Sequence, residues 1–252
     1  MIITAEQPTN PEVRPNQEIE TKILNVDLPR FEQRLELLGA VLAIPRRVVA
    51  DLNFLNSQTN EACVVIPAGF IVEQQKFNEL FLTLGYQVET AGSDLRLRGK
   101  NNFPQVKLRL RQDSDRNFIT GKFKDESHAE AESRGIKKRT ELQAEVRDLA
   151  SINKFLEDLG YRVGSRKEKY RTTYEINING AKVTIEINQS PLSKVKPWLE
   201  IEAPNEELLT QVAESLGFSK ADFFPGSDND LYRQAGFTEE ELKVIKFPNG
   251  KN

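Results

Sequence analysis

Glu18-Ile19-Glu20-Thr21-Lys22 is the stretch that decides the fold of this chain, because charged residues alternate in it with uncharged ones. Successive side chains of a β-strand point to opposite faces, so the three charged side chains project to the same side. The stretch therefore predicts a strand that carries two carboxylates and one ammonium group on a single face.

Six later stretches repeat this alternation. An antiparallel sheet whose polar face lies in water explains each stretch taken singly, and surface salt bridges between strands are a second ordinary explanation. Here, however, acids gather on the first and last stretches and bases gather mainly between them, which favours a curled sheet whose basic wall faces an acidic cluster. The residues concerned are Lys107, Arg109 and Arg111; Lys122 and Lys124; Arg139, Glu141, Gln143 and Glu145; Lys167, Lys169 and Arg171; Thr184, Glu186 and Asn188; and Glu200 and Glu202.

Length and composition are those of a soluble globular protein, with 252 residues, of which 38% are hydrophobic and 29% charged. No apolar run approaches the roughly 20 residues that a membrane-spanning helix requires, so we expect no membrane partner. Residues 1–17 are polar, contain three prolines and lack the basic start and apolar centre of a signal peptide. We therefore expect a disordered leader there and a cytoplasmic protein.

Residue counts exclude several classes of function. The single Cys63 cannot form an internal disulfide, and the single His128 excludes a histidine metal cluster or a Ser/His/Asp triad. The net charge of -3, from 35 basic and 38 acidic residues, does not mark a nucleic-acid partner. Any anion binding must therefore come from a local arrangement of charge.

Helical spacing of apolar residues predicts amphipathic helices over residues 29–38, 70–84, 149–159 and 206–216, each followed closely by glycine. The turn Asp113-Ser114-Asp115-Arg116 and the pair Asn179-Gly180 predict two hairpins, and a polar tail that includes Tyr232 follows the last helix. About eight strands with helices between them predict an α+β fold built on an eight-stranded antiparallel β-barrel with flanking helices.

Residues 56–103 interrupt this plan and are predicted to form an insertion between the second and third core strands. Within it, Leu95-Arg96-Leu97-Arg98 resembles Leu108-Arg109-Leu110-Arg111, and both stretches could supply the arginine-bearing barrel strand. We favour the second stretch because it leads directly into Lys122. The first would then be an extra surface strand.

The sorted charges indicate a particular chemistry. Carboxylate oxygens suit hard cations such as Mg or Mn, and phosphate-bound Mg usually takes only one or two protein carboxylates. Rows of Arg and Lys neutralise a polyphosphate, and phosphoryl transfer depends mostly on positioning and charge stabilisation. The first and last strands would supply the carboxylates, and the intervening strands would supply the cations.

Taken in order, these stretches resemble the CYTH domains, or triphosphate tunnel metalloenzymes, a family that includes class IV adenylyl cyclases and thiamine and inorganic triphosphatases. The resemblance spans about residues 17–232, and it predicts a tunnel domain over residues 18–235 and a C-terminal tail over residues 236–252. The ordered set is specific, whereas a lone Glu-x-Glu-x-Lys is not. The motifs are Glu18-x-Glu20-x-Lys22, Leu108-Arg109-Leu110-Arg111, Thr120-Gly121-Lys122, Arg139-x-Glu141, Lys169-Tyr170-Arg171 and Trp198-Leu199-Glu200-Ile201-Glu202.

The resemblance implies a role for each matched residue. Lys22 would orient the attacking group or stabilise charge. Arg139 would also bind phosphate, although Arg139 and Glu141 could equally pair with each other. Divalent metal, Mg or Mn, would be held by Glu18, Glu20, Glu200 and Glu202, and phosphate oxygens would be held by Lys22, Arg109, Arg111, Lys122, Lys169 and Arg171.

One departure from the family pattern concerns the strand before the last, which often carries an inward Asp. This chain has Glu186 and Asn188 there, so the metal shell would be shifted or supplied by Glu186. Trp198 is expected to pack at the core or the barrel end.

The resemblance implies a metal-dependent enzyme that hydrolyses a phosphoanhydride bond of an inorganic, nucleoside or thiamine triphosphate. Two alternatives stay open: a class IV adenylyl cyclase that converts ATP to cyclic AMP and pyrophosphate, and a polyphosphate or nucleotide binding module without catalysis. The expected partner is a triphosphate-containing small molecule, and a homodimer is left open.

Overall fold

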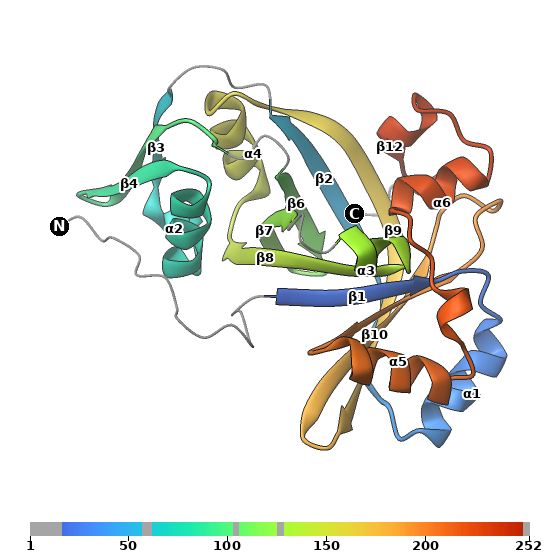
Figure 1. Ribbon diagram of the computed structural model, residues 1–252. Helices are drawn as coiled ribbons and strands as arrows, with labels where there is room; N and C mark the ends of the chain where they lie inside the picture. Colours follow the sequence, from blue (N-terminus) through green and yellow to red (C-terminus); the bar gives the residue numbers. More distant parts are fainter. Residues whose placement is uncertain (1–16, 57–61, 103–105, 125–128, 249–252) are drawn as a thin grey trace. The chain divides into compact units, whose positions relative to one another are not determined.

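The computed structural model describes residues 17–56, 62–102, 106–124 and 129–248 (Figure 1). The predicted leader lies outside the described residues except for Gln17. The chain divides into two compact units, which are described one at a time. The first unit comprises Met1–Gln17, Asp51–Lys124 and Thr140–Ser165, and the second comprises Glu18–Ala50, Asp125–Arg139 and Arg166–Asn252.

Eight strands are hydrogen-bonded in the order β10-β11-β1-β8-β7-β6-β2-β9, and β9 pairs in turn with β10. The strands therefore close into an antiparallel β-barrel, and the predicted α+β barrel with flanking helices is confirmed. The bounds are β1 (Gln17–Ile23), β2 (Val41–Asn56), β6 (Lys107–Asp113), β7 (Arg116–Lys124), β8 (Ile136–Val146), β9 (Tyr161–Ile178), β10 (Ala181–Gln189) and β11 (Trp198–Ala203).

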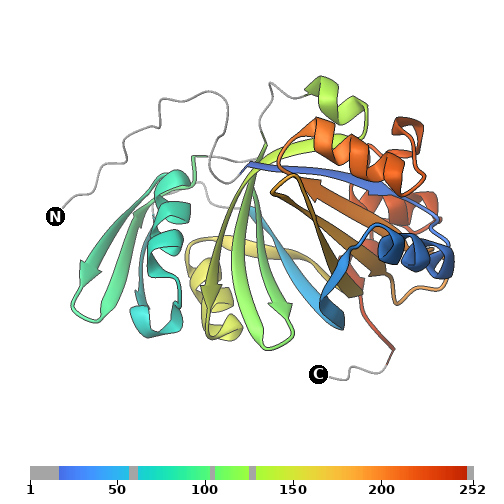
Figure 2. The same ribbon diagram turned by 90° about the horizontal axis from the view of Figure 1, so that it is seen from below.

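In the second unit, one face of β1, β10 and β11 packs against α1 (Leu28–Leu37) and α5 (Glu206–Ser215), which lie over these strands in Figure 2. Alternate strand residues meet the buried apolar stripes of the two helices, as the period-two and helical patterns predict. The charged residues of the same strands consequently point to the opposite face. The core contains Ile19, Ile23, Phe31, Leu35, Val183, Ile185, Ile187, Leu199, Ile201, Leu209 and Val212.

In the first unit, the insertion between β2 and β6 has a sheet of its own, in the order β3-β5-β4, with α2 (Gln74–Thr83) packed on it. Its strands are β3 (Ala62–Pro67), β4 (Tyr86–Ala91) and β5 (Asp94–Gly99), and a 3-10 turn, η1 (Ala68–Phe70), follows β3. The helix α4 (Leu149–Asp158) joins the same core through Ile152 and Phe155. The predicted insertion is thus confirmed as a separate βαββ arrangement.

The ambiguity between the two arginine-bearing stretches is resolved in favour of Leu108–Arg111, which lies in the barrel strand β6. The other stretch is β5, and here the expectation of a surface strand was wrong. β5 is the central strand of the insertion, and Leu95 and Leu97 are fully buried while Arg96 and Arg98 are exposed. The stretch resembles a barrel strand because both strands have one face on a core.

The region after α5 is more structured than the polar tail expected from its sequence. It contains η3 (Lys220–Asp222), α6 (Asp228–Gln234), η4 (Glu241–Lys243) and β12 (Val244–Ile245), which pairs in parallel with β9. A capping box begins α6, since Ser227 and Asp230 exchange side-chain and backbone hydrogen bonds. A short helix, α3 (Ala129–Ser133), precedes β8. Within the described residues, no helix is long and apolar enough to cross a membrane.

The insertion core should depend on Leu97, which is fully buried in the middle strand of the three-stranded sheet. We expect Leu97→Ala to lower the free energy of unfolding by about 2–5 kcal/mol, because it removes buried methyl groups and leaves a cavity. The matched control is Arg98→Ala, which alters the exposed neighbour and should leave the free energy nearly unchanged. Urea unfolding followed by circular dichroism measures both, and equal effects would contradict this packing.

Candidate functional site

Three carboxylates gather on the charged face of β1 and β11. The two strands are antiparallel and Glu20 stands directly opposite Glu202, while Glu18 is two residues along on the same face of β1. One oxygen from each of Glu18, Glu20 and Glu202 lies within 4.8 Å of the other two. We call these residues the acidic trio. Their register brings together the two ends of the sequence pattern, 182 positions apart between Glu20 and Glu202.

Lys22 is the centre of an ion cluster next to the trio. It stands opposite Glu200 in the β1–β11 register, and its Nζ lies 3.0 Å from Glu200 Oε1, 3.3 Å from Glu20 Oε1 and 3.4 Å from Asp228 Oδ1. Burial alone lowers the pKa of Lys22, but the three carboxylates outweigh burial and hold the pKa well above its usual value. Lys22 is therefore a fixed cation.

Lys169 of β9 joins the same cluster. Its Nζ lies 3.7 Å from Glu200 Oε1 and 3.5 Å from Asp228 Oδ2, and the ammonium also faces the Trp198 ring at 5.3 Å from its centroid. Burial raises the pKa of Asp228 and of Glu200, yet Lys169 and Lys22 more than reverse this effect and lower both pKa values. Both carboxyl groups are consequently ionised around neutral pH.

Two members of this cluster were missed in the sequence analysis. Asp228 is contributed by the first turn of α6, and the Ser227-x-x-Asp230 capping box was the signal that could have found this helix. Lys137 of β8 lies 3.7 Å from Glu20 Oε1 and donates to the Gly226 carbonyl at 2.5 Å. Burial and the neighbouring Lys22 lower the pKa of Lys137. Its position two residues before Arg139 continues the alternation, so period-two reasoning could have included it.

Arg171 and Arg139 were expected to contact phosphate, and both have partners within the protein. Each guanidinium nitrogen of Arg171 donates to an internal acceptor, namely Asn188, Glu186 and Glu200. Arg139 forms an ion pair with Glu132 and donates to the Lys138 carbonyl at 3.0 Å. Glu141 itself contacts Arg109 and Lys122.

The remaining predicted cations form a separate cluster in the first unit, around Asp51 and Glu141. Arg111 donates to both oxygens of Asp51, at 2.7 and 3.0 Å, and Arg109 lies 3.8 Å from Asp51 and 3.7 Å from Glu141. Lys122 Nζ lies 2.6 Å from Glu141 Oε2. The sequence analysis did not single out Asp51, yet this residue contacts both arginines of β6. Three of the predicted cations thus gather around two carboxylates.

In the second unit, the lowered pKa values of Glu200 and Asp228 keep those two acids ionised. The carboxylate oxygens of the trio are hard ligands, which fit a divalent cation such as Mg or Mn. The ion pairs on this face join Glu20, Glu186, Glu200 and Asp228 to Lys22, Lys137, Lys169 and Arg171.

The structure does not bring all four predicted metal ligands into one group. The acidic trio contains Glu18, Glu20 and Glu202, whereas Glu200 is turned toward Lys22, Lys169 and Arg171 and also accepts a hydrogen bond from Trp198 at 3.2 Å. Glu186 likewise pairs with Arg171. The donor set that fits a hard cation is thus the trio.

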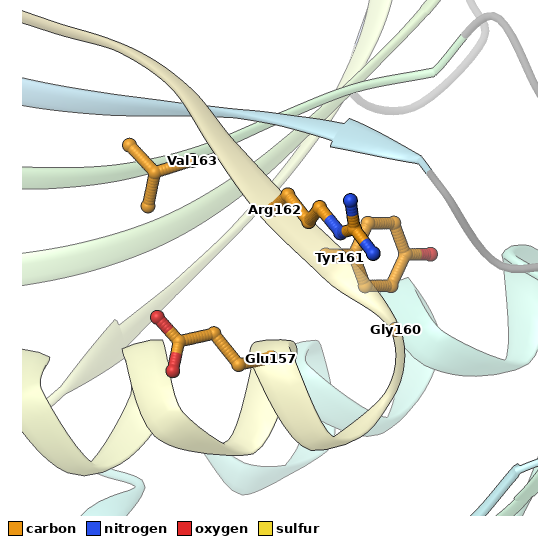
Figure 3. Close-up of a pocket in the computed structure, with 5 residues that line it drawn as sticks. All are labelled: Glu157, Gly160, Tyr161, Arg162 and Val163. Atoms are coloured by element: carbon orange, nitrogen blue, oxygen red, sulfur yellow. The ribbon is translucent and has the colours of Figure 1, made fainter.

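A pocket of about 490 Å³ lies elsewhere in the first unit, where α4 ends and β9 begins (Figure 3). Its lining offers one carboxylate and one guanidinium and includes none of the residues predicted from the sequence. It is formed by Glu157, Gly160, Tyr161, Arg162 and Val163. We therefore place the candidate site on the charged strand faces and not in this pocket.

No family model and no curated protein matches the chain. Solved structures do. The PH1012 protein from Pyrococcus horikoshii OT3 is 21% identical, with 85% of this chain and 98% of that chain covered and a TM-score of 0.51. A conserved hypothetical protein from Pyrococcus furiosus is 17% identical, with 85% and 99% covered and a TM-score of 0.51.

A third match is a protein described as a putative adenylate cyclase from Vibrio parahaemolyticus. It is 14% identical, with 87% of this chain and 99% of that chain covered and a TM-score of 0.53. At these identities the matches establish a shared fold. They bear out, at the level of the fold, the resemblance to the triphosphate tunnel metalloenzymes.

The ion pair between Asp51 and Arg111 should stabilise the first unit, because both side chains are largely buried, with 12% and 11% of their surface exposed. We expect Asp51→Asn to lower the free energy of unfolding by about 3 kcal/mol, since it removes the negative charge that accepts two hydrogen bonds from a buried guanidinium. The control is Glu175→Gln, which breaks the exposed pair with Lys182 and should have little effect. Urea titration of both variants checks this, and equal stabilities would refute the contact.

Proposed function

We propose that this chain is a divalent-metal-dependent enzyme that binds a triphosphate and hydrolyses one of its phosphoanhydride bonds. The observation that carries the proposal is the acidic trio of Glu18, Glu20 and Glu202 beside the buried cation Lys22. The trio offers hard oxygen ligands, and Lys22 offers a positive charge that faces the same side of the sheet. Metal and phosphate can thus be held next to each other.

Glu18, Glu20 and Glu202 would hold the metal ion, Mg or Mn, which when bound supplies charge neutralisation to phosphate oxygens. The sequence pattern also assigned Glu200 to the metal. Its contacts with Lys22, Lys169 and Arg171 instead favour a role in placing cations. This division leaves the metal with three candidate carboxylates from the protein and room for phosphate oxygens.

Lys22 would stabilise negative charge on the phosphate. A lysine whose pKa is raised by neighbouring carboxylates stays protonated at neutral pH, so it cannot take a proton from the attacking water. Its ammonium group can donate hydrogen bonds to phosphate oxygens when these displace one of the carboxylates. Lys169, in the same ion cluster and 8% exposed, is placed to act in the same way.

The other cations keep the roles that the family resemblance suggests. Arg109, Arg111 and Lys122 would contact phosphate, and their gathering in one cluster of the first unit supports this. Arg139 is a weaker candidate, because Glu132 already engages its guanidinium.

A second candidate function is the conversion of ATP to cyclic AMP and pyrophosphate. It is favoured by the name of the matched protein from Vibrio parahaemolyticus, which is described as a putative adenylate cyclase. Both reactions need a triphosphate, a divalent metal and cations on the phosphates, and they differ in whether water or the ribose hydroxyl attacks. The residues described above serve either reaction.

Product analysis separates the candidate functions. We expect tripolyphosphate, incubated with the protein and Mg²⁺ or Mn²⁺, to yield orthophosphate, and excess EDTA to abolish this yield. ATP and thiamine triphosphate are compared in parallel, with orthophosphate, pyrophosphate and cyclic AMP resolved by chromatography. Cyclic AMP with pyrophosphate would favour the cyclase. Binding of tripolyphosphate without any product would indicate a binding module, and the absence of both binding and products would contradict the proposal.

Neutralising one member of the acidic trio should remove the metal. We expect Glu18→Gln and Glu202→Gln to weaken Mn²⁺ binding at least tenfold and to lower hydrolysis at least a hundredfold, because each replaces a charged ligand with an amide of the same shape. Electron paramagnetic resonance measures free Mn²⁺ without substrate, so binding is read independently of activity. The control is Glu214→Gln, an exposed acid on α5, and wild-type Mn²⁺ affinity in the trio variants would sink the metal assignment.

A further inference from the structure

Two buried carboxylates stand directly opposite each other on paired strands in the second unit. Glu186 of β10 and Glu200 of β11 are register partners, and only 8% and 5% of their surfaces are exposed. Like charges at directly opposite positions of an antiparallel pair repel, and the repulsion grows when water is excluded. This pair therefore requires a positive charge held between the two acids.

Arg171 of β9 supplies that charge with its whole guanidinium group. Its Nη1 donates to Glu186 Oε1 at 2.6 Å, its Nη2 donates to Glu200 Oε2 at 3.0 Å, and its Nε donates to Asn188 Oδ1 at 3.0 Å. Asn188 is itself fully buried and is the register partner of Arg171 on β10. All three nitrogens thus face protein acceptors, two on the adjacent strand β10 and one on β11, the next strand beyond it.

Glu200, once fixed by Arg171, places the two lysines proposed to contact phosphate. Its second oxygen, Oε1, lies 3.0 Å from Lys22 Nζ and 3.7 Å from Lys169 Nζ, and it accepts from Trp198 Nε1 at 3.2 Å. One carboxylate is therefore shared between the arginine and the two ammonium groups. A shift of Glu200 would move both lysines.

We infer that Arg171 is a positioning residue, which clamps Glu186 to Glu200 and through Glu200 orients Lys22 and Lys169, and that it does not itself bind phosphate. The inference rests on the proposed function, because it takes the two lysines as substrate ligands. It revises the role that the family resemblance implies for Arg171. Lys169 makes the natural comparison, since it lies two residues away on the same face of β9 and its single ammonium nitrogen lies 3.7 Å from Glu200 and 3.5 Å from Asp228.

Asn188 strengthens the distinction. A carboxylate at position 188 would give Arg171 a third acid partner and add a negative charge to the face. The amide instead accepts one hydrogen bond from Nε and leaves the guanidinium balanced by the two acids on either side. Arginine suits this position because its planar fork reaches two carboxylates at once, which a lysine ammonium cannot do in the same geometry.

A double-variant cycle in the full chain tests the clamp. Arg171→Met, Glu186→Gln and the combined variant are compared for binding of tripolyphosphate by calorimetry in EDTA, where no metal-dependent turnover occurs. We expect Arg171→Met alone to weaken binding at least tenfold, because two buried acids then compete for Lys22 and Lys169. The combined variant removes one positive and one negative charge together, and its affinity should return to within about threefold of wild type.

Lys169→Met, with and without Glu186→Gln, is the matched control, and we expect no such recovery for it. Recovery in the Arg171 cycle alone supports the clamp. A combined Arg171 variant that binds as weakly as Arg171→Met overturns the inference, because a lost phosphate ligand is not restored by changing Glu186.

Urea unfolding of the same variants keeps this test separate from the proposed function. The clamp predicts that the effects of Arg171→Met and Glu186→Gln on unfolding are coupled. The unfolding equilibrium constant of the combined variant should be at least tenfold smaller than the value obtained by multiplying the two single effects. If the wild-type chain binds no tripolyphosphate in EDTA, the unfolding cycle decides the inference alone, and the product assay with Mg²⁺ or Mn²⁺ decides the proposed function. Independent, additive effects on unfolding would then overturn it.

Discussion

Opposed carboxylates on paired strands are the constraint on which the rest of the second unit depends. Glu20 faces Glu202 across β1 and β11, and Glu200 faces Glu186 across β11 and β10, all on the face that turns away from α1 and α5. Two negative charges at such positions destabilise a sheet unless a cation lies between or beside them. The lysines, the arginine and the predicted metal each compensate part of this repulsion.

The apolar face of the same strands imposes this constraint. Ile19, Ile185 and Ile201 are buried under the two helices, and the period of two then sends every intervening side chain to the charged face. A slip of one residue would bury the glutamates against the helices, so the register is strongly specified. The core therefore determines which acids oppose each other, and the acids in turn determine where cations are needed.

This order of causes explains what could be predicted from the sequence. Alternation identified the charged face of each strand, the ordered motifs predicted the barrel, and helical spacing found α1, α2, α4 and α5 within a few residues. Alternation does not reveal which residues face each other on paired strands. That register places Glu202 in the acidic trio and Glu200 opposite Lys22. Asp228 was missed because α6 has seven residues and too short a periodic pattern, although its capping box was legible.

The two opposed acid pairs are balanced by different means, and the difference bears on catalysis. Between Glu186 and Glu200 the cation is Arg171, whose guanidinium is hydrogen-bonded through all three nitrogens and is therefore held in one orientation. At Glu20 and Glu202 the nearby charges are lysine ammonium groups, with Lys22 3.3 Å and Lys137 3.7 Å from Glu20. Ammonium groups have single-point contacts that a phosphate oxygen or a divalent ion can replace. A guanidinium held on three sides at one pair keeps that pair in register, while the ammonium groups at the other pair can change partners and leave carboxylate oxygens available, as the proposed metal-dependent site requires.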